Sequence, residues 1–228
     1  MLAMVRFTPF LVAVLIGWIL CVAIHEFSHA VVAYWGGDRS VRARGYLTLN
    51  PLSYLHPITS ILIPCFFLIM GGIPLPGGAV LIDRSALRSR SWESWVAAAG
   101  PASNILIFLL IAVVIHPDVG LVGSEGPPPT WARFLGVLAL LQVYAVFLNL
   151  IPVPPFDGFG IIEPFLDERT RTKLANPQMR WIGLIIVFFV LFRSERAMKV
   201  FIGLVNRVLV TFGLPWDLTW GTFRMVFD

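Results

Sequence analysis

The sequence predicts an all-α polytopic membrane protein: about four to six membrane segments, a short β-hairpin and a re-entrant or extended loop on the cytoplasmic side. Of its 228 residues, 57% are hydrophobic and 13% are charged, about half the charged fraction of a soluble domain. Apolar runs at about residues 9–35, 94–115 and 131–151 are each long enough as helices to cross a bilayer. We therefore expect one integral membrane domain over residues 1–228.

The first apolar run, which ends at Gly36-Gly37, contains His25-Glu26-Phe27-Ser28-His29. On a helix the two imidazoles lie at i and i+4, about 40° apart on one face. Both can reach one zinc ion, and Glu26 can take a proton from a water that the ion activates. The alternative is a chance match. Ionisable residues inside a membrane segment each cost on the order of 2–3 kcal/mol or more, which favours a functional site.

Between the first two runs, residues 41–49 alternate loosely between apolar and polar side chains and are broken at Gly45. This pattern predicts a β-hairpin at the membrane surface. Residues 58–70 are apolar but too few to cross comfortably. Residues 71–78 contain four glycines and two prolines, which exclude a regular helix. Residues 79–82 are a candidate short strand, so the segment is expected to re-enter or to lie extended beside the site.

The second run includes Gly100-Pro101-Ala102-Ser103-Asn104, and an acidic loop at residues 116–130 follows it. The third run ends in Asn149-Leu-Ile-Pro-Val-Pro-Pro-Phe-Asp-Gly158. Residues 163–178 are charged and predict a surface helix. The catalytic core is expected at about 9–165. Membrane-associated segments are expected at about 179–214, where 181–192 and 200–214 are either tilted spans or interfacial helices.

A catalytic zinc ion takes three protein ligands and keeps one position open. The candidates for the third are His56, His116, Asp118 and Asp157, and Cys21 is either a fourth ligand or a small packing residue. Asp157 follows prolines at the end of a span, where irregular backbone at membrane depth indicates a lined cavity. The alternative for Asp157 is an ordinary Asp-Gly turn at a helix exit. The intramembrane His pair needs a partner, and that favours Asp157.

Together, His-Glu-Phe-Ser-His, Gly-Pro-Ala-Ser-Asn and the segment ending in Phe-Asp-Gly resemble the site-2 protease family of intramembrane zinc metalloproteases. The resemblance runs from about residue 10 to 165. It is closest to the small prokaryotic branch that lacks a PDZ domain, whose Asn-Pro-Leu segment matches Asn50-Pro51-Leu52. Two positions depart from the family pattern. Residues 54–57 read Tyr-Leu-His-Pro where relatives often have His-Ile-Asp-Pro, and Phe156 replaces the usual Leu.

The resemblance implies that His25, His29 and Asp157 bind one Zn²⁺ per chain and that Glu26 is the general base. Asn149 matches the family's Asn thought to stabilise the oxyanion. Asn104 is expected to orient the site or assist. These assignments imply an enzyme, a zinc-dependent metalloendopeptidase.

The expected function is regulated intramembrane proteolysis, in which peptide bonds in or near the transmembrane helix of a membrane-anchored substrate are hydrolysed. The predicted hairpin offers an edge strand to which an unwound substrate could add. The expected partners are this substrate and the lipid bilayer. With a net charge of +4 and no basic block, no nucleic-acid partner is expected. Two alternatives are a zinc-binding transporter or sensor and a catalytically inactive scaffold of the same fold.

Ligand geometry also predicts the topology. The His pair and Asp157 lie toward the C-terminal ends of their spans, so these two spans must run parallel to share one ion. With the C-terminal pair of segments left out of the count, the other face carries little but Arg6 and Arg133. The metal-proximal face collects most of the basic residues: Arg39, Arg42, Arg44, Arg84, Arg88, Arg90, Arg169, Arg171, Lys173 and Arg180. The positive-inside rule then predicts a multi-pass protein of a prokaryotic cell membrane, with its active site nearer the cytoplasmic face.

Overall fold

The computed structural model describes residues 8–54, 80–122, 126–174 and 176–227. Over these ranges the regular structure is helical and contains no strand. The expectations for His56 and for residues 58–70 and 71–78 lie outside the described ranges.

Three helices are long and apolar enough to cross a membrane: α1 (Pro9–Gly36), α4 (Arg90–Ile115) and α5 (Thr130–Asn149). They confirm the three predicted spans to within a few residues. A fourth arises within the described ranges only if α7 (Glu168–Leu174) and α8 (Pro177–Arg193), bent by 73°, form one span. The described residues thus hold three candidate spans, or four if the bent pair is one span, and the prediction of four to six segments is not confirmed. Side chains such as Ile16, Leu110 and Val113 are exposed on these helices, as expected of surfaces that face acyl chains.

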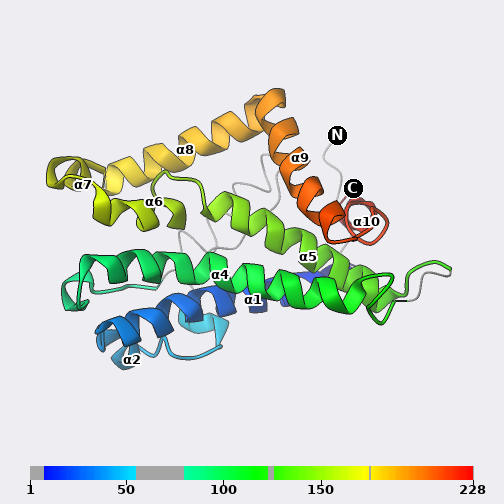
Figure 1. The fold of residues 1–228 in the computed structure, drawn as a ribbon, viewed down its shortest axis with the longest axis horizontal. Helices are drawn as coiled ribbons and strands as arrows, with labels where there is room; N and C mark the ends of the chain where they lie inside the picture. Colours follow the sequence, from blue (N-terminus) through cyan, green and yellow to red (C-terminus); the bar gives the residue numbers. More distant parts are fainter. Residues whose placement is uncertain (1–7, 55–79, 123–125, 175, 228) are drawn as a thin grey trace.

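The three long helices form a bundle in which α4 lies between α1 and α5 (Figure 1). Followed along their colours, α1 and α5 run in one direction and α4 in the other. The C-terminal ends of α1 and α5 and the N-terminal end of α4 therefore share one end of the bundle. This is the parallel arrangement that a shared ligand set requires.

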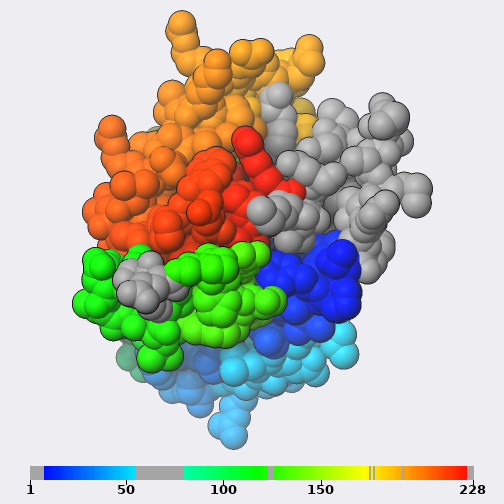
Figure 2. All heavy atoms as spheres, turned by 90° about the vertical axis from the view of Figure 1, so that its right-hand side faces the viewer, coloured from blue at the N-terminus to red at the C-terminus, as the bar shows by residue number. Residues whose placement is uncertain are grey.

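The core of the bundle surrounds α5, which is buried continuously from Gly136 to Ala145. At Gly136 a Cβ atom would lie 2.0 Å from the carbonyl oxygen of Leu218, so only glycine permits this approach. Helix α9 (Glu195–Thr211) buries Phe201, Val205 and Leu209, three residues spaced one turn apart. Figure 2 shows α9 and α10 (Trp220–Phe227) beside the starts of α1 and α5 at the end of the molecule far from the C-terminus of α1.

The predicted β-hairpin at 41–49 is wrong. Asp38 accepts a hydrogen bond from the Ser40 N–H (2.9 Å), and a short helix, α2 (Ser40–Ala43), follows. Val41 is fully buried, and Gly45 has a φ of 76°, which favours glycine. Irregular turns and a 3₁₀ helix, η1 (Pro51–Tyr54), complete the segment. The proposed edge strand for substrate therefore does not exist in these residues, and residues 80–82 form no strand either.

The remaining elements lie around the site end of the bundle. They are η3 (Arg84–Ala86), α6 (Asp157–Ile162) and η4 (Glu163–Phe165). The surface helix expected at 163–178 is shorter and corresponds to η4 and α7. Helix α1 ends at Gly36 and is capped by Gly37, whose φ of 122° favours glycine. The two C-terminal segments expected at 181–192 and 200–214 are α8 and α9.

Candidate metal centre

The two histidines of the motif lie one turn apart on α1, with their Nε2 atoms 3.1 Å from each other. Both imidazoles and Glu26 are buried, with exposed fractions of 7–8%. Helix α1 therefore aims two nitrogen ligands at one point inside the bundle.

Asp157, the first residue of α6, completes the group. Its Oδ2 atom lies 3.2 Å from His25 Nε2, and its Oδ1 atom lies 3.4 Å from His29 Nε2. One ligand atom from each of these three residues lies within 4.8 Å of the others. Within the described ranges this is the only group of three or more His, Cys, Asp or Glu side chains so arranged.

Helix α4 determines which nitrogen of each imidazole faces the shared point. His29 Nδ1 donates to the Val96 carbonyl oxygen (2.6 Å), which can only accept. His25 Nδ1 lies 3.0 Å from Asn104 Oδ1, another acceptor. With a proton on each Nδ1, both Nε2 lone pairs point toward Asp157. This is the tautomer and the outer-shell bonding typical of zinc-binding histidines.

Two further observations fit a metal ion at this point. Asp157 Oδ2 is buried and, among the described residues, makes no hydrogen bond of good geometry despite its nearness to His25. At Gly100 a Cβ atom would lie 2.3 Å from His29 Nε2 and 2.5 Å from His25 Nε2. The absence of a side chain at Gly100 thus leaves space beside both ligand nitrogens. Two imidazoles and one carboxylate form a donor set that suits Zn²⁺.

Helix α4 also holds the segment that carries Asp157. The Ser94 hydroxyl donates to the Ile161 carbonyl oxygen (2.7 Å), and a Cβ atom at Gly160 would lie 2.9 Å from Ala97 Cβ. Both contacts hold the α6 segment, and with it Asp157, against α4.

The other sequence candidates lie apart from this group. His116 caps the far end of α4, sixteen residues or about 24 Å from Gly100, and Asp118 follows it. Cys21 is a free, buried thiol outside the metal-capable group. Asn149 is the last residue of α5 and half-buried, and among the described contacts it makes no hydrogen bond to the triad.

Tyr54 is a residue near the site that the sequence analysis did not single out. It is 2% exposed, and its hydroxyl donates to the carbonyl oxygen of Tyr46 (2.8 Å) or of Thr48. Burial raises the pKa of Tyr54 to about 12; the hydrogen bond to Thr48 opposes this rise and the charge of Glu26 adds to it. Tyr54 therefore lies within electrostatic reach of Glu26. A signal existed in the sequence, because Tyr54 stands in the segment that departs from the family pattern.

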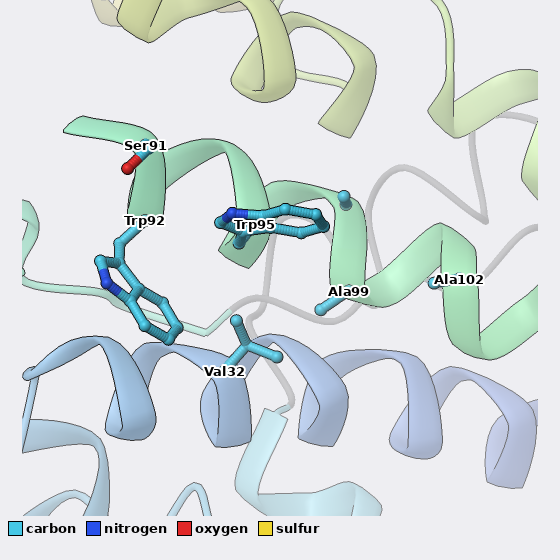
Figure 3. Close-up of a pocket in the computed structure, with 7 residues that line it drawn as sticks. Val32, Ser91, Trp92, Trp95, Ala99 and Ala102 are labelled. Carbon is cyan, nitrogen blue, oxygen red and sulfur yellow. The ribbon is translucent and has the colours of Figure 1, made fainter. Parts of the chain in front are cut away.

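An apolar groove of about 480 Å³ lies between α1 and α4 near the same end of the bundle. In Figure 3, Trp92 and Ala99 point from α4 toward α1, where Val32 lies opposite. Ser91 carries the only hydroxyl among the lining residues, which are Val32, Ser91, Trp92, Trp95, Ala98, Ala99 and Ala102. The groove therefore contributes no metal ligand.

Comparison with known proteins identifies bacterial relatives. “Putative zinc metalloprotease Rip2” of Mycolicibacterium smegmatis is 40% identical over 178 residues, which are 77% of this chain and 65% of Rip2. The protein of the same name from Mycobacterium tuberculosis is 35% identical over 78% of this chain and 66% of its own length. “Putative zinc metalloprotease YwhC” of Bacillus subtilis is 31% identical over 185 residues, 80% of each chain. The match thus spans slightly less than two thirds of either Rip2 protein.

No protein-family model and no solved structure matches the chain.

Proposed function

Because this chain belongs to the site-2 protease family of zinc metalloproteases, we propose that it is an intramembrane zinc endopeptidase. Its substrates would be membrane-anchored proteins, cut within or near a transmembrane helix in regulated intramembrane proteolysis. The observation that carries this proposal is the triad, in which two buried histidines on a helix long and apolar enough to span a membrane meet the partly buried Asp157.

Each residue of the site has a chemical role in this proposal. His25, His29 and Asp157 would hold a zinc ion, which would supply polarisation of a peptide carbonyl and a lower pKa for water. Glu26, buried on α1 between the two histidines, would take the proton of the attacking water and return it to the leaving amine. Asn104 would hold the His25 ring through Nδ1. Asn149 would donate its amide to the developing oxyanion.

A zinc transporter would need ligands that continue from the triad toward the opposite face. Within the described ranges no second metal-capable group exists, and His116 uses its Nδ1 to accept from the Asp118 N–H (3.1 Å). An inactive scaffold would not need a buried Glu26 beside intact ligands, because a buried carboxyl group is costly. Both observations favour hydrolysis.

The first prediction tests the proposal by separating metal binding from chemistry. Glu26→Gln keeps the shape of the side chain but removes the base, so the purified variant should retain about one equivalent of zinc and lose cleavage of a co-expressed single-span substrate. His25→Ala removes a ligand and should lose the metal as well. Zinc is measured by elemental analysis and cleavage by immunoblot. Normal cleavage by Glu26→Gln protein would overturn the assignment.

A further inference from the structure

We propose that four charged residues outside the metal triad, Arg84, Glu93, Glu163 and Arg171, form an anchor cluster that positions Asp157 for metal binding. The inference rests on the proposed zinc site, and it assigns to these residues a positioning role rather than a catalytic one.

The anchor cluster is a closed set of ion pairs. Arg84 Nη1 lies 2.6 Å from Glu163 Oε1 and 3.6 Å from Glu93 Oε2. Arg171 Nη2 lies 2.5 Å from Glu93 Oε2, and its Nε lies 3.6 Å from Glu163 Oε1. Each arginine thus contacts both carboxylates. The two positive charges neutralise the two negative charges.

The carboxylates of the anchor cluster are buried. The side chains of Glu163 and Glu93 are 3% and 9% exposed, and that of Arg171 is 17% exposed. A buried carboxylate that loses its partner is strongly disfavoured, whereas an exposed pair contributes little. Burial of the two carboxylates therefore strongly favours the arrangement in which both arginines stay paired with them.

The position of the cluster in the chain links it to the metal ligands. Glu163 follows the six-residue helix that begins with Asp157, and Glu93 lies in the first turn of α4, three residues before Val96. Val96 accepts from His29, and Asn104 of the same helix contacts His25. The cluster thus connects the carboxylate ligand to the helix that orients both imidazoles.

A second attachment runs alongside the first, because Ser94 of α4 donates to Ile161 of α6. The Ser94 hydrogen bond and the anchor cluster together fix the end of α6 to the start of α4 at two adjacent points. A short helix fixed at one end has little freedom to shift at the other. Misplacement of a functional group by about 1 Å can cost 10²-fold in function.

The chain supplies a matched control. Arg90 Nη2 and Glu168 Oε2 form a 3.1 Å pair that also joins α4 to α7, but these side chains are 62% and 72% exposed. Glu168→Gln makes the same chemical change as Glu163→Gln and breaks an ion pair between α4 and the chain beyond Asp157. Glu168 differs from Glu163 in being exposed and in lying further along the chain from Asp157.

The experiment compares full-length Glu163→Gln, Glu163→Asp and Glu168→Gln protein in detergent. We measure zinc affinity by competition with a chelator, the visible spectrum of the cobalt-substituted protein, and the thermal unfolding of each apo protein. Glu163→Gln should bind zinc about 10–100-fold more weakly, the usual effect of losing an outer-shell partner, and should change the cobalt spectrum. Glu163→Asp keeps the charge and should recover most of the affinity. Glu168→Gln should match the wild type.

Two results would overturn the inference. One is wild-type zinc affinity and an unchanged cobalt spectrum in Glu163→Gln protein. The other is a loss of apo-protein stability in Glu163→Gln with zinc affinity unaffected, which would mean a structural role alone. If Glu163→Gln does not fold, Arg84→Gln, at a side chain that is 42% exposed, is judged by the same criteria. Failure of the zinc site itself would appear separately, as absence of zinc from wild-type protein.

Discussion

The two asparagines of the site differ in what surrounds them, although the sequence presents both as polar residues at helix positions. Asn104 is 4% exposed and contacts the Nδ1 atom of His25. Asn149 is half-buried at the end of α5 and contacts none of the triad in the described structure. Their contributions should therefore be separable.

Asn104→Ala should weaken zinc binding, because His25 loses the acceptor that fixes its ring; the expected loss is about 10–100-fold. Asn149→Ala should leave zinc content near one equivalent and lower kcat by about 10²–10³-fold, the cost of losing an oxyanion donor. Chelator competition and cleavage rates of the two purified variants test this. Zinc loss in Asn149→Ala together with normal zinc binding in Asn104→Ala would show that the roles are reversed.

Single residues show which parts of the site could be predicted from sequence. The His-Glu-x-x-His spacing predicts His25 and His29 as ligands, and the need of this intramembrane pair for a partner favours Asp157; the structure brings the three together. The Val96 acceptor could not be found, because every residue has a backbone carbonyl. The anchor cluster also could not be found, since Glu93 and Arg171 are 78 residues apart and only tertiary packing pairs them.

At the scale of elements, α4 organises the site although it supplies no metal ligand. It offers acceptors to both histidines, an opening at Gly100 and two attachments to the chain beyond Asp157. Three of these contributions, from Glu93, Ser94 and Val96, come from its first two turns. The helix continues through Pro101, where the missing N–H removes one backbone hydrogen bond.

Gly100→Ala tests the opening in α4. Alanine normally stabilises a helix relative to glycine by about 1 kcal/mol, but here its methyl group would lie 2.3 Å from His29 Nε2. We expect zinc binding and cleavage to be lost. Gly203→Ala on α9 is the control, because no atom lies within 4 Å of the added methyl, and it should keep full zinc content. Equal zinc content in the two variants, measured by elemental analysis, would contradict the assigned opening.

The long helices were predicted better from the sequence than the short segment at 41–49. The length of each element explains this difference. The three spans were confirmed because an apolar run of about twenty residues has few alternatives. Residues 41–49 were misassigned because loose alternation over nine residues does not distinguish a strand from turns. The decisive contacts were the Asp38 carboxylate on the Ser40 N–H and the burial of Val41 against α1 and α4. The packing of Val41 is tertiary, and the Asp38 carboxylate also accepts from the Asp83 N–H, 45 residues further along the chain.

At the scale of the whole molecule, the two ends of the bundle differ in charge. The metal-proximal end carries Arg39, Arg42 and Arg44 after α1, Arg84, Arg88 and Arg90 at the start of α4, and a basic segment in α7. Among the described residues, the opposite end carries fewer basic residues, among them Arg133 at the start of α5 and Arg224 in α10. The same end that holds the triad is thus the basic one.

The last prediction is that the metal-proximal end faces the cytoplasm, since short loops rich in Arg and Lys stay on that side. Single cysteines at the exposed positions Ala43, Ser89 and Thr172, placed in a background lacking Cys21 and Cys65, should resist an impermeant thiol reagent in intact cells. Asp118→Cys, exposed beyond the far end of α4, should be labelled. All four should react after the membrane is permeabilised. Because α1 and α5 run parallel and α4 runs opposite to them, the first three positions must behave alike. Labelling of all three, with Asp118→Cys protected, would invert the orientation. Labelling of only one or two of them would contradict the parallel arrangement on which the shared triad depends.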